Sequence, residues 1–272
     1  MKRTTYILIA LVTTGIAAAF IYPFIFLLLL RSNPSPLGRT SGKTITTETP
    51  MFSRLVVKRI DKSQIYTELQ LDILADSTIQ APQFTMTGGW SEWAEINASD
   101  GTLTVSLTVP EIEALEDGSR YWSSTDLPAT LRIPSASQLH EVTVGEMGRN
   151  TLSLHGIASE SVSIAGIYYL HLDSCRITAL TTEARYCWDG RFTAKASPMR
   201  RVNLLFNDSH SYTFDNLDSS PVDTLVLQPE NSNNNISLTN ARIGTLLMRP
   251  TNDSGKVDVD LGAETLTGAL TK

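Results

Sequence analysis

The internal repeat in the second half of the chain limits the possible folds more than any other feature. LVLQP at Leu225–Pro229 returns as LLMRP at Leu246–Pro250, an offset of 21 residues. Repeats of about 20 residues with short strands and Asn or Gly corners are typical of β-solenoids, in which each coil buries its apolar side only against the next coil. Asn231 returns as Asn252, which predicts a side-chain ladder at one corner. Further apolar repeats, at offsets of 18 to 21 residues, relate Leu204–Phe206 to Leu225–Leu227, Ile236 and Leu238 to Val257 and Val259, Val142 and Val144 to Val162 and Ile164, and Leu152 and Leu154 to Leu170 and Leu172.

Apolar and polar residues alternate in short runs from Met51 onward, as in Thr102–Val109. Alternation over four to eight residues predicts strands with one buried face. We therefore predict an all-β fold for residues 51–272, a parallel β-solenoid (β-helix) with coils of about 20 residues. Residues 51–130 would supply N-terminal strands and a cap, and residues 131–262 the regular coils. Asn97–Gly101 predicts a hairpin turn and Pro110–Asp117 a short helix. A β-sandwich with evenly spaced strands is the competing interpretation.

An apolar run close to the N-terminus predicts one transmembrane helix in front of this domain. Tyr6–Leu30 has no charged residue and is almost wholly apolar, and a membrane-spanning helix needs about 20 such residues. We assign residues 1–31 to a membrane anchor with its helix at 6–30. A cleaved signal peptide is the competing interpretation, but the apolar stretch of a signal is only about 7–15 residues long.

A Pro-, Gly- and Ser/Thr-rich segment, residues 32–50, predicts a flexible linker between the anchor and the domain. The positive-inside rule decides the orientation weakly, because two basic residues precede the apolar run while Arg31, Arg39 and Lys43 follow it. The short N-terminal tail favours a cytoplasmic N-terminus, with the domain in the periplasm or outside the cell. A cytoplasm-facing sensor or regulatory domain remains the alternative.

The charge of the chain disfavours two classes of partner. The sequence has 22 basic and 28 acidic residues, with a net charge of −6. Three basic residues lie in residues 1–31, so the rest of the chain carries a net charge of −9. This acidity argues against binding to nucleic acid or to anionic lipid headgroups. The expected partners are the membrane, through the helix, and an envelope glycan or protein. The last coil, near Lys256–Leu261, also allows edge pairing into a homo-oligomer.

No catalytic, cofactor-binding or metal-binding motif is present, so we predict no catalytic residue, no cofactor and no metal. The four histidines lack ligand spacing. His155 and His171 alternate with apolar residues, so we expect both to point outward from their strands. Asp253, Asp258 and Asp260 form the best candidate for a calcium site, but an exposed polar strand face is the simpler interpretation. The only local mixed-charge cluster consists of Asp189, Arg191, Lys195, Arg200 and Arg201. It falls where the repeat is weakest, and we expect a loop or insertion at Thr181–Pro198.

Two further groups of residues are candidates for a structural or binding role. Cys175 and Cys187 are the only cysteines, and they either form a disulfide in an oxidising compartment or remain buried free thiols. An aromatic cluster lies in the first half of the chain, outside the repeat. It forms either a sugar- or protein-binding surface or a cap on the open end of the solenoid. Its members are Trp90, Trp93, Tyr121 and Trp122.

Residues from Met51 to about Gly262 resemble the head-GIN domain, a family described as a "putative autotransporter adhesin" and typical of Bacteroidetes. The resemblance lies in Phe52–Val57, Asp100–Val105 and Leu131–Val144, and in the units LSLHG at Leu152–Gly156 and VSIAG at Val162–Gly166. It implies a β-solenoid that is exported or anchored in a membrane. No functional residue carries over from the family, because its motifs are structural.

These observations predict a membrane-anchored, extracytoplasmic β-solenoid with a non-enzymatic binding, adhesion-like or structural role in the cell envelope. A carbohydrate-active enzyme on a β-helix scaffold is the alternative from another class, with Asp189 and Arg191 as its first candidate residues.

Overall fold

A computed structural model describes residues 44–60, 67–87, 93–108, 125–145, 148–185, 189–207, 211–215, 217, 219–230, 234–253, 255–262, 265 and 270–271. All of them belong to one compact unit, Thr40–Lys272. Every regular element in these ranges is a β-strand, so the all-β prediction is confirmed for this part of the chain.

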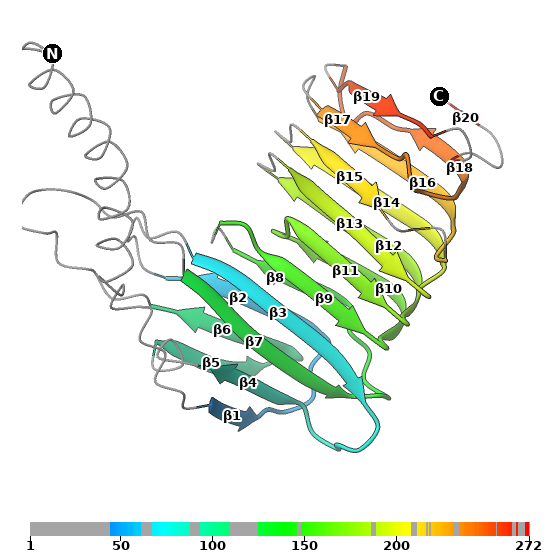
Figure 1. The fold of residues 1–272 in the computed structure, drawn as a ribbon. Coiled ribbons are helices and arrows are strands. Elements are labelled where there is room, and N and C mark those ends of the chain that lie inside the picture. Colours follow the sequence, from blue (N-terminus) through cyan, green and yellow to red (C-terminus); the bar gives the residue numbers. More distant parts are fainter. Residues whose placement is uncertain are drawn as a thin grey trace, which may run out of the picture. The chain divides into compact units, whose positions relative to one another are not determined.

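The strands form two ten-stranded sheets, which we call the first and the second sheet (Figure 1). The first sheet has the spatial order β1 (Thr44–Glu48), β4 (Gln83–Thr87), β7 (Thr125–Pro134), β3 (Thr67–Asp76), β9 (Thr151–His155), β11 (Tyr169–Asp173), β13 (Gly190–Lys195), β15 (Tyr212–Asp215), β17 (Asn234–Ser237) and β19 (Val257–Asp260). The second sheet has the order β20 (Leu270–Thr271), β18 (Ile243–Met248), β16 (Val222–Pro229), β14 (Met199–Asn207), β12 (Arg176–Arg185), β10 (Ala158–Ala165), β8 (Glu141–Val144), β2 (Arg54–Arg59), β6 (Thr102–Leu107) and β5 (Ala94–Ser99).

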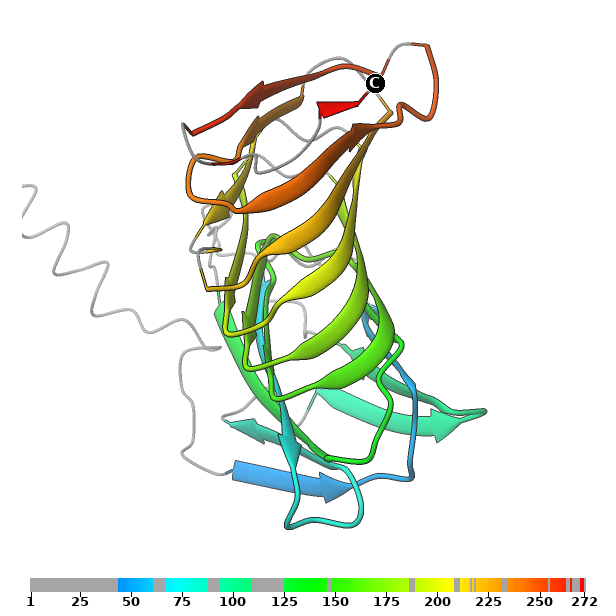
Figure 2. The ribbon, with the colours of Figure 1, turned by 90° about the vertical axis from the view of Figure 1, so that its right-hand side faces the viewer.

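From β8 onward the chain alternates regularly between the two sheets. From β10 onward each strand pairs in parallel with the strand two places before it, as β10 does with β8 and β11 with β9. The turned view in Figure 2 shows these strands as two layers, with each turn of the chain stacked on the one before. One strand in each layer per turn is the physical origin of the repeat in the sequence.

The predicted repeat gives the correct register in two places and is wrong by two residues in three others. Leu225 pairs with Leu246 and Leu152 with Leu170, at the predicted offsets of 21 and 18 residues. A shift of two residues leaves the same side chains facing the core, so the apolar pattern cannot exclude it. The corrected pairs are Leu204 with Leu227, Val142 with Ile164, and Ile236 with Val259.

The N-terminal strands join the same sheets out of sequence order. β3 lies between β7 and β9, and β2 lies between β6 and β8. The antiparallel pairs are β1–β4, β4–β7 and β5–β6. The predicted hairpin is confirmed between β5 and β6, where Asp100 and Gly101 have φ of 50° and 69°. Positive φ at both central residues is what a type I′ turn requires.

The end of the predicted linker needs a correction. Thr44–Glu48, placed in the flexible segment 32–50, forms β1 and pairs with β4 from Thr44–Thr87 to Glu48–Gln83. Thr and Ile favour the extended backbone, and Thr46 and Thr85 share a hydroxyl–hydroxyl hydrogen bond of 3.0 Å across the pair. The ordered domain therefore begins before Met51.

The core lies between the two sheets and is built from the inward-facing residue of each alternating pair. Phe192 and Phe214 pack edge to face in neighbouring strands, with ring centroids 5.3 Å apart. At the corner that follows the first sheet, buried hydroxyls join successive turns of the chain. The N–H of Cys175 donates to Ser197 Oγ (2.9 Å), and the N–H of Ser197 donates to Ser220 Oγ (2.8 Å).

Several predicted elements lie outside the described residues. These are the anchor helix at 6–30, the linker before residue 44, the short helix Pro110–Asp117, and the Asn231 member of the proposed ladder. Across the ranges that the structure does describe, no helix is both long and apolar enough to cross a membrane.

Candidate functional site

The outward face of the first sheet carries a regular array of polar side chains. In β9 and β11 every second residue is buried, and in β13 Phe192 and Ala194 are buried, so the residues between them point away from the core. The parallel register aligns these outward residues in three rows of three. We call this array the outer grid; its rows are Thr151–Tyr169–Arg191, Ser153–His171–Thr193 and His155–Asp173–Lys195.

The middle row of the outer grid continues across most of the first sheet. Ser153 aligns with Asp72 in β3, and Thr193 aligns with Asp215 in β15. Beyond Asp72, the row runs through Thr130, Thr85 and Thr46. Eight strands at a spacing of about 4.8 Å make a polar row about 34 Å long. An array of this length suits an extended ligand better than a small molecule.

His171 lies at the centre of the outer grid and is half-buried. Its Nδ1 is 2.5 Å from Thr193 Oγ1 on the neighbouring strand. Burial lowers the pKa of His171 below its usual value, and the nearby charge of Arg191 lowers it further, against the opposing effect of Asp72. His171 is therefore neutral at pH 7, and its ring acts as a hydrogen-bonding group rather than a cation.

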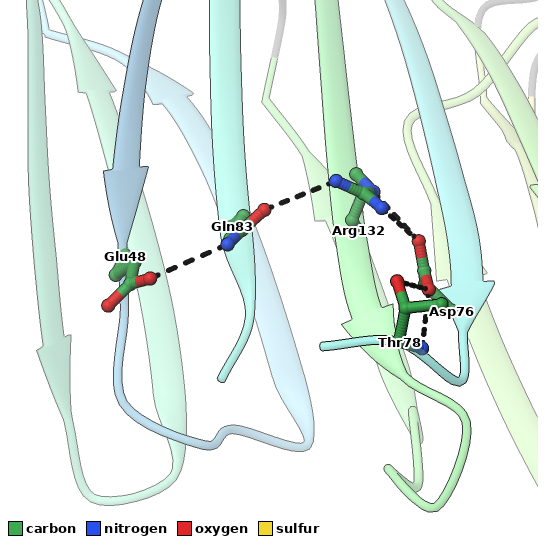
Figure 3. A network of polar contacts seen from close by, with 5 residues as sticks. All are labelled: Glu48, Asp76, Thr78, Gln83 and Arg132. Carbon is green, nitrogen blue, oxygen red and sulfur yellow. Dashed lines mark hydrogen bonds and ion pairs between the residues drawn. The ribbon is translucent and has the colours of Figure 1, made fainter. Parts of the chain in front are cut away.

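A second polar group, shown in Figure 3, joins the outward faces of β1, β4, β7 and β3. Arg132 pairs with Asp76 and donates from Nη1 to Gln83 Oε1 (3.4 Å), and Gln83 donates to Glu48 Oε1 (3.4 Å). The hydroxyl and the backbone N–H of Thr78 both donate to Asp76 Oδ1, at 2.6 and 2.7 Å. These bonds and Arg132 lower the pKa of Asp76 to about 2. Asp76 stays ionised at neutral pH, so it cannot serve as a general acid there.

The mixed-charge cluster predicted from the sequence is divided between the two sheets. Arg191 and Lys195 lie in β13 of the first sheet, whereas Arg200 and Arg201 lie in β14 of the second. The prediction of a loop or insertion at Thr181–Pro198 is wrong for most of that segment, because it contains the end of β12 and all of β13. The basic residues therefore do not converge on one substrate atom.

The remaining candidates have structural surroundings or lie outside the described residues. Trp93 packs partly buried against the core, while Trp90, Tyr121 and Trp122 are outside. Cys175 is a buried thiol whose Sγ donates to Leu154 O (3.2 Å). Cys187 lies outside the described residues, so its pairing with Cys175 stays a prediction. Within the described residues, no group of three or more His, Cys, Asp or Glu side chains is placed to hold a metal ion.

Sequence reasoning missed both the outer grid and the group around Asp76. The grid depends on the strand register, which alternation alone leaves open by two residues. The Asp76 group had one local signal in the sequence Asp76-Ser-Thr78. An aspartate in such a turn accepts a hydrogen bond from the backbone N–H of the residue two positions later, here Thr78.

Comparison with known proteins gives distant structural likenesses only. No family model matches the chain, and no curated protein matches it by sequence. A "putative adhesin" from Bacteroides fragilis has a TM-score of 0.36 at 10% identity, covering 87% of this chain and 97% of that one. A "putative cell adhesion protein" from Clostridium sporogenes has a TM-score of 0.32 at 8% identity, covering 81% and 98%. A "putative lipid binding protein" from Parabacteroides distasonis has a TM-score of 0.34 at 9% identity, covering 85% and 97%. Likenesses this distant leave function to be argued from the residues of this chain.

Proposed function

We propose that this chain is a membrane-anchored β-solenoid of the head-GIN type, held outside the cytoplasm, that works as a non-enzymatic binding or adhesion-like module of the cell envelope. The observation that carries the proposal is the outward polar face of the first sheet, aligned in register from β1 to β15. A rigid sheet holds such side chains at fixed spacings, which is how a repeat protein presents an extended binding surface.

The chemistry of this face supports binding rather than catalysis. Asp76 is ionised and engaged by Thr78 and Arg132, and the Nδ1 of His171 is engaged by Thr193. Acid–base catalysis needs a group that exchanges a proton near the working pH and reaches the reacting atom. Asp76 and the Nδ1 of His171 are engaged by neighbours within the sheet instead.

The solenoid assignment is supported by the strand order. Strands from β8 to β20 alternate between the two sheets and pair in parallel within each of them, so each turn of the chain stacks on the one before. The anchor and the location are supported by the sequence, through the apolar run Tyr6–Leu30 and the Pro- and Ser/Thr-rich segment that follows it.

Labelling in intact cells tests the location. Native Cys175 is buried, so in a Cys187→Ser background a new cysteine at exposed Ser161 supplies the reporter. We expect Ser161→Cys to react with a membrane-impermeant maleimide once the outer barrier alone is opened, and the parent chain to stay unlabelled at Cys175. Labelling of Ser161→Cys only after the inner membrane is broken would place the domain in the cytoplasm and refute the proposal.

Binding of the full-length, detergent-solubilised protein to purified envelope fractions tests the site. Ser153→Arg puts a long charged side chain into the middle of the outer grid, and Ser163→Arg puts the same side chain on the outward face of the second sheet. We expect Ser153→Arg to abolish binding and Ser163→Arg to preserve it. Equal binding by both variants would show that the first sheet is not the binding face.

A further inference from the structure

We propose that the outer grid binds an uncharged, hydroxyl-rich saccharide chain. This inference rests on the proposed binding function and names the class of ligand. It follows from three properties of the grid, which are its charge balance, the neutral state of its central group and the placement of its one tyrosine ring.

The charges on and around the grid nearly cancel. Arg191 and Lys195 are exposed cations of β13, and Asp173 aligns directly with Lys195 on the next strand. Asp72 and Asp215 flank the middle row on either side. Surfaces that bind polyanions or polycations show one dominant sign of charge, because complementary charge steers such ligands. A balanced surface favours a ligand without net charge.

The middle of the grid offers hydrogen-bonding groups that are neutral at pH 7. His171 is half-buried beside Thr193, and Ser153 lies on its other side in the same row. The groups that face His171 are Asp72 from the β3 side, His155 from β9, and Arg191 from β13. Hydroxyl and imidazole groups both donate and accept hydrogen bonds, as the hydroxyls of a sugar do.

Tyr169 supplies an apolar ring next to this polar row. It lies in β11, two residues before His171, between Thr151 and Arg191. A tyrosine ring combines a flat apolar surface with a polar hydroxyl, which matches a sugar ring with its C–H faces and hydroxyl rim. Protein interfaces instead depend on clusters of Trp, Tyr, Met and Arg anchors, and Tyr169 is the only Trp, Tyr or Phe residue of the outer grid. The saccharide is therefore the better fit.

Binding of the full-length protein in detergent micelles to immobilised polysaccharides tests the inference. The probes are dextran and mannan as neutral chains and polygalacturonate as an acidic one. We expect retention on at least one neutral probe that is unchanged between about 0.05 and 0.5 M NaCl, because little charge is involved. Tyr169→Ala should weaken this binding at least about tenfold, and Tyr169→Phe, which keeps the ring, by less than about threefold. Ser163→Arg, on the other sheet, should leave it unchanged.

The outcomes separate this inference from the proposed function. Salt-sensitive retention on polygalacturonate alone would overturn the neutral ligand and leave the binding module in place. Absence of retention on every saccharide probe, with envelope binding still abolished by Ser153→Arg, would overturn the saccharide and keep the outer grid as a site for another partner. Envelope binding that is insensitive to Ser153→Arg would overturn the proposed function and this inference together.

Discussion

Replacement of Ser220 by alanine tests whether the buried corner hydroxyls hold successive turns of the chain together. Ser220 is fully buried, and its Oγ accepts a hydrogen bond from the N–H of Ser197 at 2.8 Å. Ser220→Ala leaves that N–H without its acceptor in a place that water does not reach. An unsatisfied buried donor costs about 1–3 kcal/mol. A loss of about 2 kcal/mol corresponds to a fall in Tm of about 4–8 °C for a domain of this size.

The neighbouring residue provides the matched control. Ser219 Oγ accepts from the N–H of Ala196 at 3.4 Å, but this bond is exposed. Water replaces the lost acceptor in Ser219→Ala, so the expected cost is within about 0.5 kcal/mol. Urea unfolding of the unit Thr40–Lys272 measures both variants against the parent. Equal free energies of unfolding for Ser219→Ala and Ser220→Ala would refute the reasoning, because burial is the main difference between the two sites.

Three further predictions concern a glycine corner and two titratable groups. Gly166→Ala should lower the free energy of unfolding by about 3 kcal/mol or more, whereas Gly156→Ala should cost about 1–2 kcal/mol, measured by urea unfolding. Both glycines have positive φ (77° and 68°), but a Cβ on Gly166 would lie 1.8 Å from Val144 O and one on Gly156 meets nothing closer than 3.7 Å. Asp76 has its pKa lowered from 3.8 to about 2, so its contribution to stability is present above pH 3.8 and is lost as the pH falls toward 2. Asp76→Asn should remove that part of the pH dependence, and an unchanged acid-unfolding curve would contradict it. Burial lowers the pKa of His171, so its contribution is present above pH 6.5 and is lost as the pH falls below that value. NMR titration of the His171 ring, with His171→Gln as the control for assignment and stability, should give a pKa below 6.5.

Alternation in the sequence was sufficient to predict an all-β fold and the inward or outward direction of most side chains. The sequence correctly predicted one stacked pair of strands, in which Leu152 and Leu154 align with Leu170 and Leu172. The pairing of Leu204 was misplaced because strands repeat their side-chain direction every two residues. Register is fixed by the lengths of the corners, which the apolar pattern does not report.

The candidate site was less accessible to sequence reasoning than the fold. His155 and His171 were expected to point outward, but nothing in the sequence placed His171 near Arg191 and Asp72. Their proximity depends on the pairing of β3 with β9, of β9 with β11 and of β11 with β13. The β3–β9 pair joins segments that lie far apart in the chain. The insertion of β3 between β7 and β9 had no local signal, since strand order outside the regular repeat is decided by packing over the whole core.

The position of β2 and β3 inside the sheets affects a chain that is made from its N-terminus. These two strands are synthesised early, yet each needs neighbours on both sides that come much later, as the bond from Leu69 N–H to Asn150 Oδ1, across 81 residues, illustrates. Closing so long a loop is slow, because its entropy is lost before the contacts form. A nascent chain that has not yet reached β9 therefore carries β3 with one edge unpaired and its apolar side uncovered. Such an intermediate is prone to aggregate, and its protection during synthesis is a requirement that the finished structure no longer displays.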